Sequence, residues 1–126
     1  MEVMLLLITL LLIKHAVADF FLQRSFMFKD KHIYAGRGGL VHAASHGLLT
    51  AIAVAICVPL PLQLPLALAA GIADMLIHYH IDYIKSNWNV RTQSSPNETR
   101  YWYAFGLDQL AHFLTYVLIV YLIFIG

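Results

Sequence analysis

Four long apolar runs dominate this chain and constrain its fold more than any other feature. A run of ~20 apolar residues is long enough to cross the ~30 Å hydrocarbon core of a bilayer as an α-helix. We therefore expect four spanning helices in one domain covering residues 1–126, at about 3–23, 39–58, 66–85 and 96–125. Short connections favour antiparallel neighbours. The expected fold class is an all-α, integral-membrane four-helix bundle with up-down-up-down topology.

The composition also indicates that lipid surrounds most of the chain. The chain is 60% hydrophobic and 12% charged, whereas about 25% of residues are charged in an average soluble protein. The formal net charge of +1 gives no reason to expect a nucleic-acid partner. A single cysteine, Cys57, excludes a disulfide framework within the chain. The partner that composition indicates is the lipid bilayer.

The first run also has an alternative interpretation as a cleaved signal peptide. Ala16-Val17-Ala18 has the small-x-small form of a processing site. However, the segment before the apolar stretch contains Glu2 and no lysine or arginine. Cleavage would also separate His15 from Asp19, a pair with the same spacing as pairs in the other runs. We therefore interpret this run as a spanning helix.

Basic residues are concentrated in two of the three connections. They lie near residues 24–38 and 86–95, while the proline-rich turn at 59–65 and both chain ends carry almost none. Short loops rich in lysine and arginine remain on the cytoplasmic side. This pattern predicts that those two connections are cytoplasmic and that both termini and the proline turn lie outside.

Each apolar run also carries His or Asp residues spaced four apart, which stack along one stripe of a helix. The pairs fall late in the first and third runs and early in the second and fourth, which is the same end of an up-down-up-down bundle. Unsatisfied polar groups in hydrocarbon cost several kcal/mol, so the stripes should face one another in one layer. The predicted metal ligands are His15, Asp19, His42, His46, Asp74, His78, Asp82, Asp108 and His112.

Histidine and aspartate without Cys or Glu favour a borderline or hard divalent ion. Zinc is the first expectation, with manganese and iron as alternatives. Two divalent ions would cancel the charge of four carboxylates and a third would attract an anionic substrate, so we expect two or three ions. Ligand atoms from different helices should then approach to about 3–4 Å. Gln23 and Lys85 continue two stripes at the cytoplasmic mouth and are candidate substrate contacts; Lys14 has no role in this scheme.

The combination of these motifs resembles a family of small bacterial and phage-borne membrane proteins, grouped as domain of unknown function 3307. The resemblance runs through His15 to Gln23, His42 to His46, Asp74 to Lys85 and Asp108 to His112. It implies a bacterial inner (cytoplasmic) membrane. In spacing and residue type alone, the pattern is also similar to inner-membrane metal-dependent hydrolases and to the zinc phospholipase C and P1 nuclease group. Those soluble enzymes use a chain-terminal ligand, and Met1 here lies far from His15 along the first helix.

Three functions are compatible with the pattern. The first is a metal-dependent hydrolase, a phosphoesterase acting on a lipid or lipid-linked substrate, in which metal ions activate water and hold phosphoryl oxygens. The second is a carrier of ions, metal or protons, because intramembrane Asp and His also mark relays. The third is a non-enzymatic membrane partner protein that uses the polar layer for structure.

Overall fold

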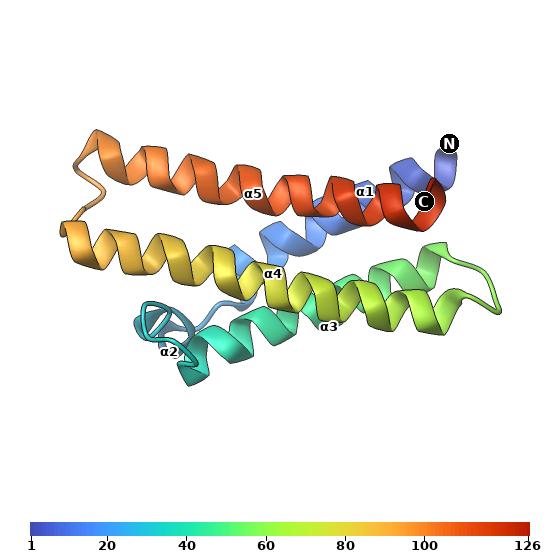
Figure 1. Cartoon of the computed structure of the whole chain (residues 1–126), viewed down its shortest axis with the longest axis horizontal. Helices are drawn as coiled ribbons and strands as arrows, with labels where there is room; N and C mark the ends of the chain where they lie inside the picture. Colours follow the sequence, from blue (N-terminus) through green and yellow to red (C-terminus); the bar gives the residue numbers. More distant parts are fainter.

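The structure, a computed structural model that describes all 126 residues, consists entirely of helices and their connections. Four long helices lie side by side and alternate in direction (Figure 1). Between the first and second of them the chain forms a π-helical turn and a short surface helix. The elements are α1 (Glu2–Ala16), η1 (Val17–Leu22), α2 (Ser25–Lys29), α3 (Arg37–Cys57), α4 (Gln63–Thr92) and α5 (Thr99–Phe124). The predicted all-α four-helix bundle is confirmed.

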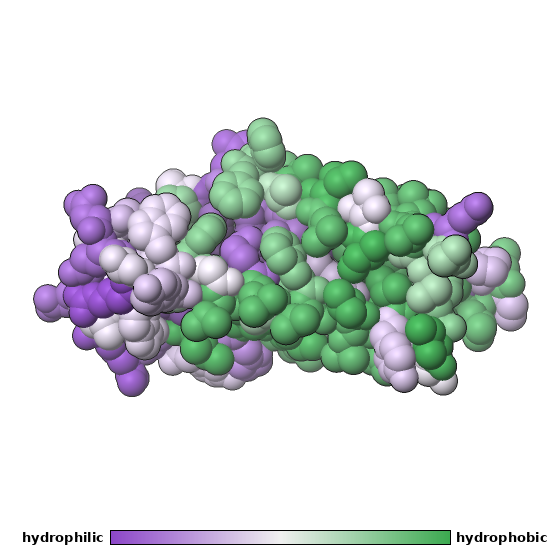
Figure 2. Space-filling view, turned by 90° about the horizontal axis from the view of Figure 1, so that it is seen from above, coloured by the Kyte–Doolittle hydropathy of each residue, from purple (hydrophilic) through white to green (hydrophobic).

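The two ends of the bundle differ in chemistry. Both termini and the α3–α4 turn lie at one end, called the terminal end, and α2 and the α4–α5 connection lie at the other, called the polar end (Figure 1). Hydrophilic residues cover the polar end, whereas hydrophobic residues cover most of the remaining face in Figure 2. Every lysine and arginine except Lys14 belongs to segments at or near the polar end. The charge asymmetry expected from sequence is therefore a feature of the folded shape.

Helix α1 together with η1 (Glu2–Leu22), and α3, α4 and α5 each alone, are long and apolar enough to cross a membrane. Large apolar side chains such as Leu68, Ile72 and Leu118 are about half exposed, as lipid-facing positions require. Inside the terminal half, the helices pack around an apolar core in which Leu7, Leu11 and Val54 are fully buried. The chain is therefore a membrane protein with an apolar core toward one end.

Several helix boundaries differ from the predicted ones. Helix α4 continues to Thr92, through the segment 86–95 that polarity assigned to a loop. Polar residues disfavour contact with lipid but do not break a helix, and no Gly or Pro lies between Gly71 and Pro96. Gln93 then ends the helix in the left-handed conformation, with the Ser94 N–H donating to the Asn89 carbonyl at 3.0 Å.

The starts of α4 and α5 also differ from the predicted ones. Helix α4 begins at Gln63, so Pro65 lies in its first turn, where a missing N–H costs no helical hydrogen bond. Helix α5 begins at Thr99, three residues after the predicted Pro96. The side chain of Glu98 does reach back to the Ser95 N–H at 3.2 Å, but as the residue that precedes the helix and not as one inside it. Helix α2 was not predicted.

Helices α3 and α4 make a close backbone contact at Gly47 and Gly71. A Cβ atom built on Gly47 would lie 2.6 Å from the Gly71 carbonyl oxygen, and one on Gly71 would lie 2.7 Å from the Gly47 carbonyl oxygen. Small residues that permit such approach are how membrane helices gain packing energy in the absence of a hydrophobic drive. Gly47 of α3 therefore lies directly opposite Gly71 of α4.

Replacing either glycine by alanine should separate α3 from α4. We expect Gly47→Ala and Gly71→Ala each to lower the free energy of unfolding by about 1–3 kcal/mol, because backbone cannot move aside as a side chain can. Gly106→Ala is the matched control, since a Cβ there meets no atom within 4 Å. It should be neutral or stabilising by up to about 1 kcal/mol through helix propensity. Unfolding in mixed micelles measures all three; equal effects at Gly47 and Gly106 would contradict the contact.

Candidate metal centre

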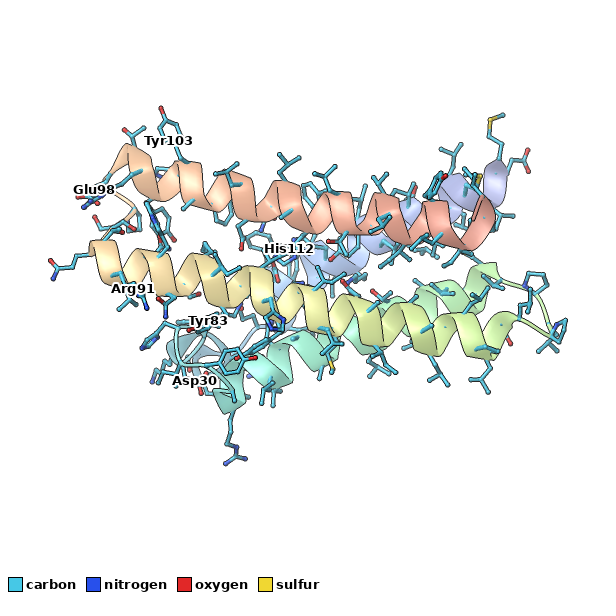
Figure 3. The ribbon with its side chains drawn as sticks, in the orientation of Figure 1. Asp30, Tyr83, Arg91, Glu98, Tyr103 and His112 are labelled. Carbon is cyan, nitrogen blue, oxygen red and sulfur yellow. The ribbon has the colours of Figure 1, made fainter.

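The four His and Asp stripes converge in the bundle interior, on the polar-end side of the apolar core. Eight of the nine predicted ligand residues are at most 7% exposed, and the ninth, Asp19, is only partly exposed. His112 is seen pointing inward between α5 and α4 in Figure 3. The expectation that the stripes face one another at one depth, rather than the lipid, agrees with this arrangement.

A first group of donors comes from η1, α3 and α4. Asp19 Oδ1 lies 3.0 Å from His46 Nε2 and 3.1 Å from His42 Nε2. His42 Nε2 in turn lies 3.2 Å from His78 Nε2. Asp19 is held in a π-helical turn, a local widening of the helix that often occurs at functional sites. One atom from each of these four residues lies within 4.8 Å of the others.

A second group lies beside the first and shares His78 with it. It consists of His78, Asp82 and His112, from α4 and α5. Asp82 Oδ2 is 3.4 Å from both His78 Nε2 and His42 Nε2, so this carboxylate touches both groups. His112 Nε2 is 3.8 Å from Asp82 Oδ1. The two groups together form one continuous polar cluster.

Three predicted ligands stand at the margin of these groups. His15 contacts Asp19 Oδ2 at 3.3 Å but is bonded by its ring nitrogens to Tyr116 and Gln109, at 2.8 and 3.1 Å. Asp108 lies 3.7 Å from His112 Nε2. Asp74 belongs to neither group, and its Oδ2 accepts hydrogen bonds from Lys14 and Thr50 at 2.6 Å each. The structure brings six of the nine residues into the two groups and places these three next to them.

Two buried lysines enter this region that sequence reasoning did not assign. Lys14, 7% exposed, pairs with Asp74 and lies 3.3 Å from His46 Nδ1. Lys31, also 7% exposed, reaches in from the α2–α3 connection and pairs with Asp82 Oδ2 at 2.6 Å. A lysine within an apolar run indicates a buried carboxylate partner, so the pairing of Lys14 could have been predicted from its position in the sequence. Lys31 carried no such signal, because it lies among loop residues.

The Lys31 connection is fixed on both sides of that lysine. Asp30 accepts hydrogen bonds from the Gly38 and Gly39 N–H groups at 3.1 and 3.2 Å, at the start of α3. The Ala35 N–H donates to the Tyr79 hydroxyl at 2.6 Å. The labelled Asp30 in Figure 3 lies beside this helix start. These hydrogen bonds hold the loop in place over the side of the cluster that faces the polar end.

The first group fits a tetrahedral divalent ion in its donor types and spacing. Zn–N bonds of ~2.0–2.1 Å in a tetrahedron place neighbouring donor atoms about 3.4 Å apart. Three of the six separations here are 3.0, 3.1 and 3.2 Å, and all six are within 4.8 Å. The outer nitrogens of His42 and His78 have no hydrogen-bond partner, unlike the usual carboxylate-supported ligand. The donor atoms of the first group fit an ion, but the rings of His42 and His78 lack the second hydrogen bond that usually orients a ligating histidine.

Charge limits how many ions the cluster attracts. Asp74, Asp82 and Asp108 lie 2.6, 2.6 and 3.6 Å from the ammonium groups of Lys14, Lys31 and Lys85. Only Asp19 has histidines alone as partners. Three of the four carboxylates are thus already balanced by lysines, so the charge argument for two or three ions holds only for Asp19 in the first group. An ion in the second group has to displace Lys31 from Asp82.

Comparison with protein families now adds to the geometry. Residues 7–125 match the model of a family described as "Protein of unknown function (DUF3307)". The chain belongs to the DUF3307 family. The match includes all nine predicted ligand residues, which confirms the resemblance drawn from the four motifs, and the family description assigns no activity. No curated protein and no solved structure matches this DUF3307 chain.

The Lys14–Asp74 pair gives a direct test of the buried charges. Lys14→Met leaves Asp74 unpaired in an apolar region and should lower the free energy of unfolding by about 3–5 kcal/mol. The double variant Lys14→Met/Asp74→Leu should recover most of that loss, because it removes both charges. Arg100→Met, which removes an exposed ion pair with Glu98, is the control and should change stability little. Losses that simply add in the double variant would argue against the pair.

Proposed function

We propose that this protein is a membrane-embedded metal-dependent hydrolase, a phosphoesterase acting on a lipid or lipid-linked substrate. The observation that carries the proposal is the first donor group, Asp19, His42, His46 and His78, whose donor atoms come from three elements and lie within 4.8 Å of one another. Zinc is the proposed ion, with manganese or iron as alternatives. We place the first ion in this group. A second ion would be held by Asp82 and His112 with a further ligand in place of His78, because the single lone pair of His78 Nε2 binds one ion.

The residues divide into binding and charge-balancing roles. A divalent ion in such a site lowers the pKa of a coordinated water and polarises phosphoryl oxygens. Asp19 supplies the carboxylate of the first group, and the three histidines fix its orientation. Lys31, presented by its fixed loop, is placed to bind an anionic oxygen once Asp82 releases it. Gln23 and Lys85 remain proposed contacts to the substrate head group.

Access favours a substrate that comes from the membrane. A groove of about 560 Å³ between α1 and α5 has His15 and Gln109 in its lining, with apolar residues for the rest. A molecule with an apolar tail can therefore reach the margin of the cluster without crossing the covering loop.

A carrier function is the alternative, and one observation favours it. Hydrogen bonds link Asp74 through Lys14 and His46 to Asp19, as a proton relay requires. Against a carrier, the fully buried Leu7, Leu11 and Val54 fill the interior between these hydrogen-bonded residues and the terminal end. A polar site closed by an apolar core on one side suits chemistry at one membrane surface better than passage across it. The role of a membrane partner protein stays a third possibility.

The metal is tested first. Protein purified without a histidine tag should contain at least one equivalent of a transition metal by elemental analysis. His46→Ala should lower the affinity for that metal about 100-fold or more, since changes even to supporting residues cost 10–100-fold. His80→Ala is the matched control, because His80 is exposed and bonds only its own helix at Leu76. Less than one equivalent in the native protein, or equal metal content in both variants, would remove the premise.

The same variants then separate enzyme from carrier. With phospholipid vesicles as substrate, the native protein and His80→Ala should release phosphate or a phosphorylated head group, and His46→Ala should not. Reconstituted vesicles should show no ion or proton flux above that of empty vesicles. Metal binding with flux that Asp74→Asn abolishes, and without hydrolysis, would assign the carrier function instead.

We further propose that the polar end faces the cytoplasm of a bacterium, across its inner membrane. The basic residues at the polar end support this orientation through the positive-inside rule. They are Arg24, Lys29, Lys31 and Arg37 in and around α2, and Lys85, Arg91 and Arg100 near the end of α4 and the start of α5. In a Cys57→Ala background, Asn97→Cys should react with an impermeant maleimide only after the cells are opened. Leu62→Cys, on the α3–α4 side, should react in intact cells. The reverse labelling would place the metal cluster in the outer leaflet.

A further inference from the structure

The connection between the first and second spanning segments carries large apolar side chains that no helix covers. Four phenylalanines there are 51–80% exposed, Phe20 and Phe21 at the end of η1 and Phe26 and Phe28 in α2. Among the helices, α2 packs against α3 alone, and in Figure 1 it lies at the polar end beside the start of α3. Rings this exposed are unfavourable in water and favourable in lipid. The phenylalanines therefore indicate that this connection contacts the bilayer.

Exposed basic residues are interspersed with these rings. Arg24, Lys29 and Arg37 are all exposed. The ion pairs that lysines and arginines form in this chain use other residues, namely Lys14, Lys31, Lys85 and Arg100. The one acid of the connection, Asp30, accepts hydrogen bonds from two N–H groups of α3 instead. The connection thus presents three positive charges that form no ion pair within the protein.

These charges lie at the depth of the lipid head groups. The first spanning segment ends at Leu22 and α3 begins at Arg37, so residues 23–36 lie at the membrane surface. Arg24 follows Leu22 by two residues, which is at most about 7 Å at ~3.3–3.6 Å per residue. Lys29 ends α2, a helix of only five residues, or about 8 Å at ~1.5 Å per residue. Cations within about one Debye length of an anionic surface, ~8–10 Å, are attracted to it.

We infer that residues 20–29 together with Arg37, called the interfacial segment, bind anionic phospholipid. The four phenylalanine rings lie among the outer acyl-chain carbons, and the three cations bind the phosphate groups of lipids that carry a net negative charge. An acidic protein partner fits less well, because the rings adjoin lipid-facing residues such as Leu22, 47% exposed, and a protein there would have to displace the bilayer. The inference needs neither the metal nor the hydrolysis proposed above.

Quenching by brominated lipids tests both the depth of α2 and its lipid preference. In a Trp88→Phe/Trp102→Phe background, which removes both native tryptophans, Phe26→Trp reports on α2. The protein is placed in bilayers of equal phosphatidylglycerol and phosphatidylcholine, with brominated acyl chains on one lipid or on the other. Quenching should show the anionic lipid preferred at least about fivefold, because one basic residue near an anionic surface contributes about that factor.

A second tryptophan position is the matched control. Leu118 is 49% exposed on α5, and no lysine or arginine follows Arg100 in the chain. Leu118→Trp in the same background should therefore be quenched about equally by the two brominated lipids. Equal quenching of Phe26→Trp by both lipids would overturn the anionic preference. No quenching of Phe26→Trp by either lipid would also overturn the inference, since α2 would then lie outside the bilayer and be left for a protein partner.

Substitutions identify the cations that bind the lipid. Arg24→Gln/Lys29→Gln/Arg37→Gln, added to Phe26→Trp, should lower the preference to about one. Arg100→Gln is the control, because Arg100 is also exposed but lies in α5, which does not pack against α2. It should leave the preference unchanged. A triple variant that keeps the full preference would contradict the assignment of these three residues.

Two solution conditions separate a lipid head group from a free anion. Raising NaCl from about 0.1 M to about 1 M should reduce the preference severalfold, because the Debye length falls from about 10 Å to about 3 Å. A preference independent of salt would count against the inference. Inorganic phosphate at millimolar concentration should reduce the preference no more than NaCl of the same ionic strength. A larger loss in phosphate would mean that the cations form a site for a free anion and not for lipid.

Discussion

The structure depends on one constraint: charged groups placed in hydrocarbon must find partners inside the protein. Four aspartates and five histidines lie on stripes of helices whose other faces contact lipid, and only convergence satisfies them all. Lys14 and Lys31 belong to the same solution, because each neutralises a carboxylate that would otherwise be buried alone. The close contact at Gly47 and Gly71 brings α3 and α4 near enough for their histidines to touch.

The sequence predicted the fold class and the shared depth of the stripes because both follow from simple periodicities. Apolar length defines a spanning helix, and a spacing of four residues defines a stripe, so His42 and His46 had to face the same way. Antiparallel order then placed every pair at one end. Two of these ladders were longer than recognised: Thr50 continues that of His46, and Tyr116 that of His112, and both contact the cluster.

What the sequence did not show depends on pairing between distant segments. Nothing local distinguishes Asp74, held by Lys14, from Asp19, held by histidines, since both occupy the same kind of stripe position. The role of Lys31 follows from a loop whose shape is fixed by Asp30 and Tyr79, eight and more residues away from the atoms they bond. The end of α4 was misjudged because polarity reports the solvent around a segment and not its backbone conformation.

The buried Lys14–Asp74 pair also bears on how the chain enters the membrane. Lys14 is made 60 residues before its partner, so at ~5–20 residues per second α1 waits on the order of 3–12 s for Asp74 to be synthesised. An unpaired lysine near the middle of a spanning helix costs ~2.5–3.5 kcal/mol on the insertion scale, which the leucines of α1 must offset alone. Biosynthesis thus passes through a stage in which α1 is inserted but chemically incomplete. Lys14 gains its partner only when α4 is inserted, so the packing of α4 against α1 follows the insertion of α1 as a separate step.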